Sequence, residues 1–294
     1  MGFLGSFFKF GRNEEDIEPA DPFFAEVLTE LGESITSAPN YEEELSKALQ
    51  IGSDYLARQI SLLPGPIHIS ESAFSADPVL STMFHHAEDI RFALGRSIET
   101  REVIPGLAKE GATQAYALLG MRTRELENPD GTKVTVFMDH SIKCVTTSAE
   151  DARETLSRVA LSRVLKSFAE HTDKLRRRGK LLRVEWSIIS ARARGNGAHD
   201  SGEFVFAEEE LKPANLLRGL CAWLSDPMDH LRIKAEGARI SVQIPGAAKP
   251  LVYDLPMLYS ADRRQWLVSI VEFPVDECMA ALSNETRTHR YIYI

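Results

Sequence analysis

Two histidine–carboxylate pairs are the residues of this sequence best suited to metal chemistry. His85 and Asp89 are four residues apart, a spacing that places both on one helix face and allows them to share a divalent cation. Asp139 and His140 follow a run of β-forming residues, at the end of an expected strand. A catalytic zinc site needs three protein ligands, and no HExxH spacing supplies them. We therefore expect a solvated pair at His85 and Asp89, and keep a metal-assisted hydrolase using all four residues as an alternative.

The other motifs that carry chemistry are missing from the sequence. The glycines at 195, 197 and 202 do not form GxGxxG, and they precede a strand-like segment where a dinucleotide fold has a helix. Gly179-Lys180 is followed by Leu181, so it is not a P-loop, and no GxSxG elbow occurs. The sequence therefore predicts no cofactor and no bound metal, and it identifies no catalytic residue.

Cysteine content and composition favour a reducing compartment. Cys144, Cys221 and Cys278 are odd in number and widely separated, which is unlike a disulfide framework or a structural zinc site. The 294 residues are 44% hydrophobic and 26% charged, as in a globular protein. No apolar run approaches the roughly 18–20 residues that span a bilayer. We expect a soluble, cytoplasmic protein, with peripheral membrane association as an alternative.

One basic run stands out in an acidic chain of net charge -9. Residues 1–120 contain 8 Lys and Arg against 19 Asp and Glu, whereas residues 150–194 contain 12 against 6. Such a run can bind an anionic surface, stabilise a helix end, or contact the acidic N-terminal half. No aromatic residues interleave with it to stack bases, so nucleic-acid binding is a further alternative only. The candidate anion-binding residues are Lys174, Arg176, Arg177, Arg178, Lys180 and Arg183.

An aromatic segment opens the sequence, and the acidic residues between 14 and 18 separate it from the first expected helix. A segment of this kind can insert shallowly into a membrane interface or bind a groove on a partner protein. The alternative is that it folds back onto the protein. The candidate docking residues are Phe3, Leu4, Phe7, Phe8 and Phe10.

A long amphipathic helix over residues 150–178 is the element that presents the basic run. Its apolar stripe recurs at spacings of four and three residues, with acidic residues in the first turn and the arginines in the last. Gly179 is placed to end this helix. The stripe spans only about two heptads, so we expect packing within the fold rather than a coiled coil. The stripe residues are Leu161, Leu165, Phe168, Thr172 and Leu175.

Helical periodicity dominates before residue 120 and strand periodicity after it. Helices are expected to begin at Pro22, Tyr41 and Pro78, with a fourth over 108–119. Strands are expected at 121–127 and 132–139, joined by a turn, and at 142–147, 182–188, 231–235, 238–244 and 265–273. Further helices are expected from Pro213 and over 275–282.

These elements predict an α+β fold with an N-terminal helical bundle, a small antiparallel sheet, a long central amphipathic helix and a C-terminal mixed region. The expected divisions are a tail at 1–20, helices at 21–120, a hairpin and the central helix at 121–180, and an α+β region at 181–294. The function favoured by the sequence is a non-catalytic adaptor that docks to a protein partner, or to a membrane, through its aromatic segment and basic helix end.

Overall fold

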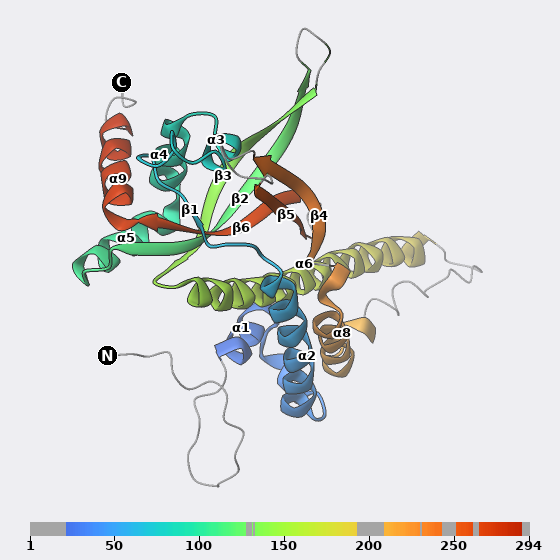
Figure 1. Cartoon of the computed structure of the whole chain (residues 1–294). Helices are drawn as coiled ribbons and strands as arrows, with labels where there is room; N and C mark the ends of the chain where they lie inside the picture. Colours follow the sequence, from blue (N-terminus) through green and yellow to red (C-terminus); the bar gives the residue numbers. More distant parts are fainter. Residues whose placement is uncertain are drawn as a thin grey trace.

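The computed structural model describes residues 22–127, 131, 133–192, 209–229, 231–242, 251–260 and 265–289. The fold is α+β, as the sequence predicts, and a long helix, α6 (Ala149–Arg192), lies between a helical bundle and a twisted sheet (Figure 1). The bundle contains α1 (Pro22–Leu31), the 3-10 helix η1 (Glu33–Ser37), α2 (Tyr41–Ser61) and α8 (Pro213–Ser225).

The sheet has the strand order β3-β2-β6-β5-β4, with antiparallel pairing throughout, and the short β1 pairs parallel to β6. The strands are β1 (Ile67–His68), β2 (Gln114–Glu127), β3 (Lys133–Thr146), β4 (Leu231–Val242), β5 (Leu251–Ser260) and β6 (Gln265–Pro274). The remaining elements are α3 (Leu80–Met83), α4 (Ala87–Arg96), α5 (Ile98–Lys109), η2 (Pro227–Asp229) and α9 (Val275–His289).

Helices cover both faces of the sheet, which explains the composition of its central strands. On β2, Ala117 and Leu119 face a core shared with α4, α5 and α9, whereas Leu118 faces a core shared with α2 and α6. A strand that is buried on both faces is apolar at successive positions, so it lacks the alternation by which strands are recognised. The helix predicted over 108–119 is therefore wrong: α5 ends at Lys109 and β2 begins at Gln114.

Three cores hold these layers together, and α6 contributes to two of them. Val164, Leu165 and Phe168 pack with α1, α2 and α8 in the bundle. Ala152 and Ala160 pack with α2, β2 and β6 against the sheet. The predicted stripe on this helix is thus an internal contact surface over its first half.

Other predicted boundaries differ from the structure. The helix expected from Pro78 is two short helices, α3 and α4, because Phe84 between them has an extended backbone and His86 begins a new capping box. The strands expected at 231–235 and 238–244 are one strand, β4, with an irregularity between Lys234 and Ala238. The helix from Pro213 and the strand over 265–273 are confirmed.

Candidate functional site

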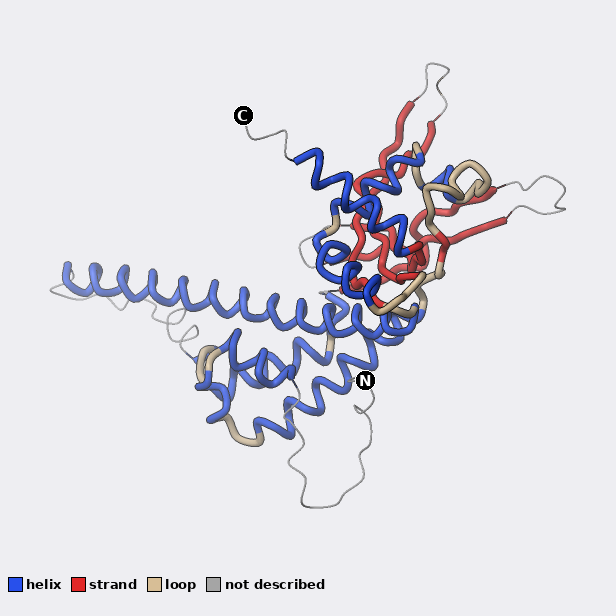
Figure 2. The backbone as a smooth tube through the Cα atoms, turned by 90° about the vertical axis from the view of Figure 1, so that its left-hand side faces the viewer, coloured by secondary structure: helices blue, strands red, loops and turns tan. Residues whose placement is uncertain are grey.

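The second half of α6 projects beyond the bundle, and we call residues 174–192 the α6 arm (Figure 2). The sequence predicts that the helix ends at Gly179 and that a strand follows at 182–188, and both predictions are wrong. A glycine inside a helix destabilises it by about 1 kcal/mol relative to alanine, which an already nucleated helix tolerates. A projecting segment has no strand to pair with, and only a helix satisfies its backbone hydrogen bonds internally.

The α6 arm carries an apolar surface that points away from the bundle. Leu181 is 66% exposed, Val184 56% and Ile188 45%. Leu181 and Ile188 come sixteen residues after the buried Leu165 and Thr172, and sixteen residues turn a helix by about 160°. These three apolar residues therefore lie on the side of α6 opposite its bundle contacts. We call Leu181, Val184 and Ile188 the outer apolar residues.

The predicted anion-binding residues all lie on α6 at the base and first turns of the arm. Lys174, Arg177, Arg178, Lys180 and Arg183 are exposed. Arg176 differs from the others because it is half-buried. Its guanidinium lies 2.9 Å from the Asp173 carboxylate and donates to the carbonyl oxygen of Leu31 at 3.4 Å. Arg176 therefore ties the base of the arm to α1, and the exposed basic residues form the surface.

Basic and apolar side chains share the outward face of the helix. Lys174 precedes Leu181 by seven residues, and Arg177 precedes Val184 by seven, so each pair is two turns apart on nearly the same side. The whole arm contains seven basic residues and one acidic residue. This arrangement suits an amphipathic helix that binds a surface combining negative charge with an apolar groove.

The outer apolar residues were missed as a site by the sequence reasoning. The alternation of Leu182, Val184, Trp186 and Ile188 fits a strand with one buried face, and that prediction places Val184 and Ile188 inside the protein. The spacing of Leu181, Val184 and Ile188 at i, i+3 and i+7 is the signal that identifies a helical face.

The structure brings the two predicted histidine–carboxylate pairs near one another, but Asp89, Asp139 and His140 already have polar partners. The Asp89 carboxylate accepts hydrogen bonds from the backbone amides of His85 and His86, at 3.1 and 2.8 Å. His140 contacts the carbonyl oxygen of Met83 through Nε2 at 2.8 Å. Asp139 lies 3.4 Å from the guanidinium of an exposed arginine on β2. Within the described ranges, no three His, Cys, Asp or Glu side chains are grouped so that they could hold a metal ion.

The His140 side chain packs where β3 meets the end of α3. Its ring stacks on that of Phe84, with centroids 4.3 Å apart. Burial lowers the pKa of His140, although its bond to the Met83 carbonyl and the nearby charges of Asp89 and Asp139 act in the opposite direction. The neutral imidazole thus joins β3 to the turn between α3 and α4, and it has a structural role there.

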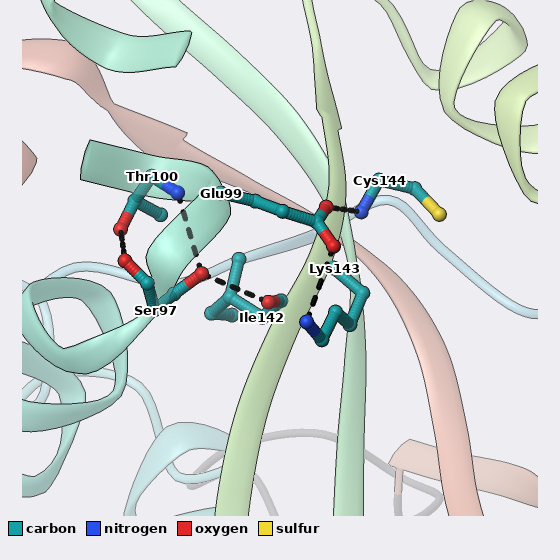
Figure 3. Close-up of polar contacts among 6 residues, drawn as sticks. All are labelled: Ser97, Glu99, Thr100, Ile142, Lys143 and Cys144. Atoms are coloured by element: carbon teal, nitrogen blue, oxygen red, sulfur yellow. Dashed lines mark hydrogen bonds and ion pairs between the residues drawn. The ribbon is translucent and has the colours of Figure 1, made fainter. Parts of the chain in front are cut away.

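A second polar cluster lies where α5 meets β3 (Figure 3). The Glu99 carboxylate accepts a hydrogen bond from the backbone amide of Cys144 and lies 3.2 Å from Lys143 Nζ. Cys144 has a φ of 55°, and the register of β3 against β2 shifts by one residue there, as in a β-bulge. Nearby, the Ser97 hydroxyl donates to the carbonyl oxygen of Ile142 at 3.0 Å. These contacts stabilise an irregular strand.

The three cysteines are free thiols with little nucleophilic character. Burial raises the pKa of Cys144 and Cys278 to about 12, and that of Cys221 to about 11. Because the thiolate is the reactive form, none of them is an effective nucleophile at neutral pH.

The predicted docking residues Phe3, Leu4, Phe7, Phe8 and Phe10 lie outside the residues that the structure describes. Among the helices it does describe, none has the length and apolar character needed to cross a membrane.

No protein-family model matches this chain, and no curated protein or solved structure matches it significantly. The α6 arm is the feature of the described residues that combines projection, charge and exposed apolar side chains.

Proposed function

We propose that this protein is an interaction protein that binds an acidic, grooved surface of a protein partner through the α6 arm. The observation that carries the proposal is the exposure of Leu181, Val184 and Ile188 on the outward side of a projecting basic helix. Three apolar residues at i, i+3 and i+7 are the anchors by which an amphipathic helix binds a hydrophobic groove.

The basic residues of the arm support a partner whose groove has an acidic rim. Lys174 and Arg177 lie two turns before the outer apolar residues, where they would contact the edge of a partner's groove. Complementary charge at an interface rim mainly raises the association rate and selects the partner, while burial of the apolar anchors supplies most of the affinity. A rigid helix also loses little conformational entropy on binding.

The two alternative functions have less support. A metal-assisted hydrolase using His85, Asp89, Asp139 and His140 would require Asp89, Asp139 and His140 to leave their present partners. Nucleic-acid binding through residues 176–180 would leave the outer apolar residues without a role, because phosphate contacts need charge alone.

A comparison of two double variants tests the proposal. Leu181→Ser with Ile188→Ser removes the apolar anchors, and the matched control, Ile51→Ser with Val159→Ser, removes apolar residues of similar exposure on α2 and on the first half of α6. Each protein is used for affinity capture with quantitative mass spectrometry, and for sedimentation with anionic vesicles and with RNA.

We expect an acidic partner that the wild-type protein and the control retain and the arm variant loses, with binding weakened by salt. Identical sets of captured proteins from both variants would overturn the proposal. Loss of vesicle or RNA binding alone in the arm variant would replace the protein partner with an anionic lipid surface or with nucleic acid.

A further inference from the structure

We propose that residues 3–21 of this chain bind along the outward face of its own α6, with the aromatic segment covering Leu181, Val184 and Ile188. The contact does not depend on the function proposed above. Its consequence, that an acidic partner competes with this segment for the arm, rests on that function.

The first line of support is the position at which the segment joins the fold. Glu26 on α1 contacts Ser162 through its carboxylate and lies 3.8 Å from Lys166 Nζ. Further along, Leu31 accepts the hydrogen bond from Arg176. α1 therefore runs in the same direction as α6, and Pro22, which begins α1, lies beside the first third of the long helix. The preceding residues therefore start at the flank of α6 where α1 packs, and they would pass around the helix to reach its outward side.

The length of the segment is sufficient for this contact. From Ser162 to Leu181 is nineteen residues, or roughly 29 Å of helix, and Pro22 lies roughly 6 Å further back than Glu26 along α1. The twelve residues from Pro22 to Phe10 can span roughly 40 Å when extended, so even the nearest of the aromatic residues can reach the arm.

The order of chemistry along the segment matches the order along the helix. Away from Pro22, the sequence first presents its acidic side chains and then its aromatic ones. Along the outward side of α6 come first Arg163, Lys174 and Arg177, all exposed, and then the outer apolar residues. Arg163 and Leu181 are eighteen residues apart, five full turns, so they lie on the same side of the helix. The acidic residues of the segment are Glu14, Glu15, Asp16, Glu18 and Asp21.

Charge also separates this occupant from a second copy of the arm. Two α6 arms side by side would bring together fourteen basic residues and two acidic ones, and like charges at an interface oppose association. The acidic segment instead neutralises the basic residues. Because it is tethered, its effective concentration at the helix is in the millimolar range, so a weak contact is populated.

The test uses the full chain with a photoreactive benzophenone amino acid in place of Phe7. After irradiation of the monomer at low concentration, digestion and mass spectrometry locate the cross-linked residues. We expect intramolecular cross-links within residues 177–190. Lys174→Glu with Arg177→Glu should reduce their yield by roughly five-fold, because both charge complementarities are reversed. The control Arg124→Glu, at an exposed position on β2, should leave the yield unchanged.

Three results would overturn the proposal. The cross-links could lie mainly on other surfaces, or form only between two chains. The third is a cross-link yield that the Lys174 and Arg177 substitutions leave unchanged. The readout needs no partner, so it separates the two proposals. Cross-links to the arm without any arm-dependent partner would leave this contact and remove the proposed function. An arm-dependent partner without such cross-links would support the proposed function and remove this contact.

Discussion

The carboxylate of Glu277, in the first turn of α9, accepts a hydrogen bond of 2.7 Å from the buried hydroxyl of Ser70, across 207 residues of sequence. The same carboxylate accepts bonds from the Ser72 hydroxyl at 2.7 Å and the Glu71 amide at 2.8 Å. One side chain thus fixes the loop after β1 onto the first turn of α9.

Replacement of Glu277 by alanine is expected to lower the free energy of unfolding by about 2 kcal/mol, because it removes the charged acceptor shared by the Ser70 and Ser72 hydroxyls and the Glu71 amide. Urea denaturation of the variant checks this value. The matched control is Glu102→Ala on the exposed side of α5, which should change stability by less than about 0.5 kcal/mol. Equal effects at the two positions would contradict the structural role of Glu277.

The Glu277 contacts also predict a pH dependence. Burial alone raises the pKa of Glu277, but hydrogen bonds from Ser70, Ser72 and the Glu71 amide outweigh it and hold the pKa below the ordinary 4.5. A folded-state pKa that is depressed adds stability above the unfolded value, and this stability is lost as the pH falls through the folded value. The stability gap between the wild-type protein and Glu277→Gln should therefore narrow below pH 4.5. A gap that is constant from pH 7 to pH 3 would contradict this origin.

Two glycines on helices should respond oppositely to replacement by alanine. At Gly52 on α2, an added Cβ would stand 2.6 Å from the carbonyl oxygen of Leu224 on α8. Gly52→Ala should therefore force the two helices apart and lower the free energy of unfolding by about 1–3 kcal/mol. At Gly106 on α5, no atom lies within 4 Å of the position that an added Cβ would take. Gly106→Ala should therefore raise the free energy of unfolding by about 0.5–1 kcal/mol. Thermal unfolding of both variants provides the comparison, and the same sign for both would be inconsistent with this packing.

The left-handed backbone at Asp139 predicts an order of stability for three residues at this position. Its φ is 55° and its side chain is exposed on β3. Asp139→Gly should be neutral or slightly stabilising, whereas Asp139→Val should destabilise by about 1–2 kcal/mol, because a β-branched residue fits poorly at positive φ. Melting temperatures ordered valine, aspartate, glycine from lowest to highest are expected, and a valine variant as stable as the wild type would refute the conformation.

The arm should contribute little to global stability. Leu181→Ser with Ile188→Ser removes exposed side chains and should change the free energy of unfolding by less than about 0.5 kcal/mol. Phe168→Ala, in the packed half of the same helix, should cost about 3–5 kcal/mol. Chemical denaturation of both variants distinguishes the projecting part of α6 from its buried part.

The fold class and most helices could be predicted from local patterns, because elements with one buried face show their period directly. The bundle face of α2 and the inward leucines of α8 are examples, and both are buried. The errors arise where tertiary context decides. β2 is apolar on both faces, and its Ala115 to Met121 run resembles a buried helix segment. β5 was missed altogether, because Asp254 and Pro256 interrupt its pattern.

The candidate site was predicted only in part. The basic run is visible in the composition of residues 174–183, but its setting depends on whether α6 continues past Gly179. Residues 182–188 alternate well enough for a strand, and a strand needs a neighbour that the sequence cannot supply locally. Only the structure shows that Leu181 and Ile188 are exposed on a projecting helix.

The position of β6 has a consequence for how the protein is made. This strand lies between β2 and β5 and also pairs with β1, yet it is the last strand among the residues that the structure describes. During synthesis, β2 and β3 leave the ribosome well before the residues that complete the sheet. The edge of β2 that pairs with β6 therefore stays unpaired until residues 265–274 have emerged. Most strand pairs of this sheet are consecutive in the sequence, but the pairing of β2 with β6 joins distant parts of the chain, and such pairing is intrinsically slow. Until residues 265–274 have emerged, the edge of β2 that pairs with β6 stays open to aggregation.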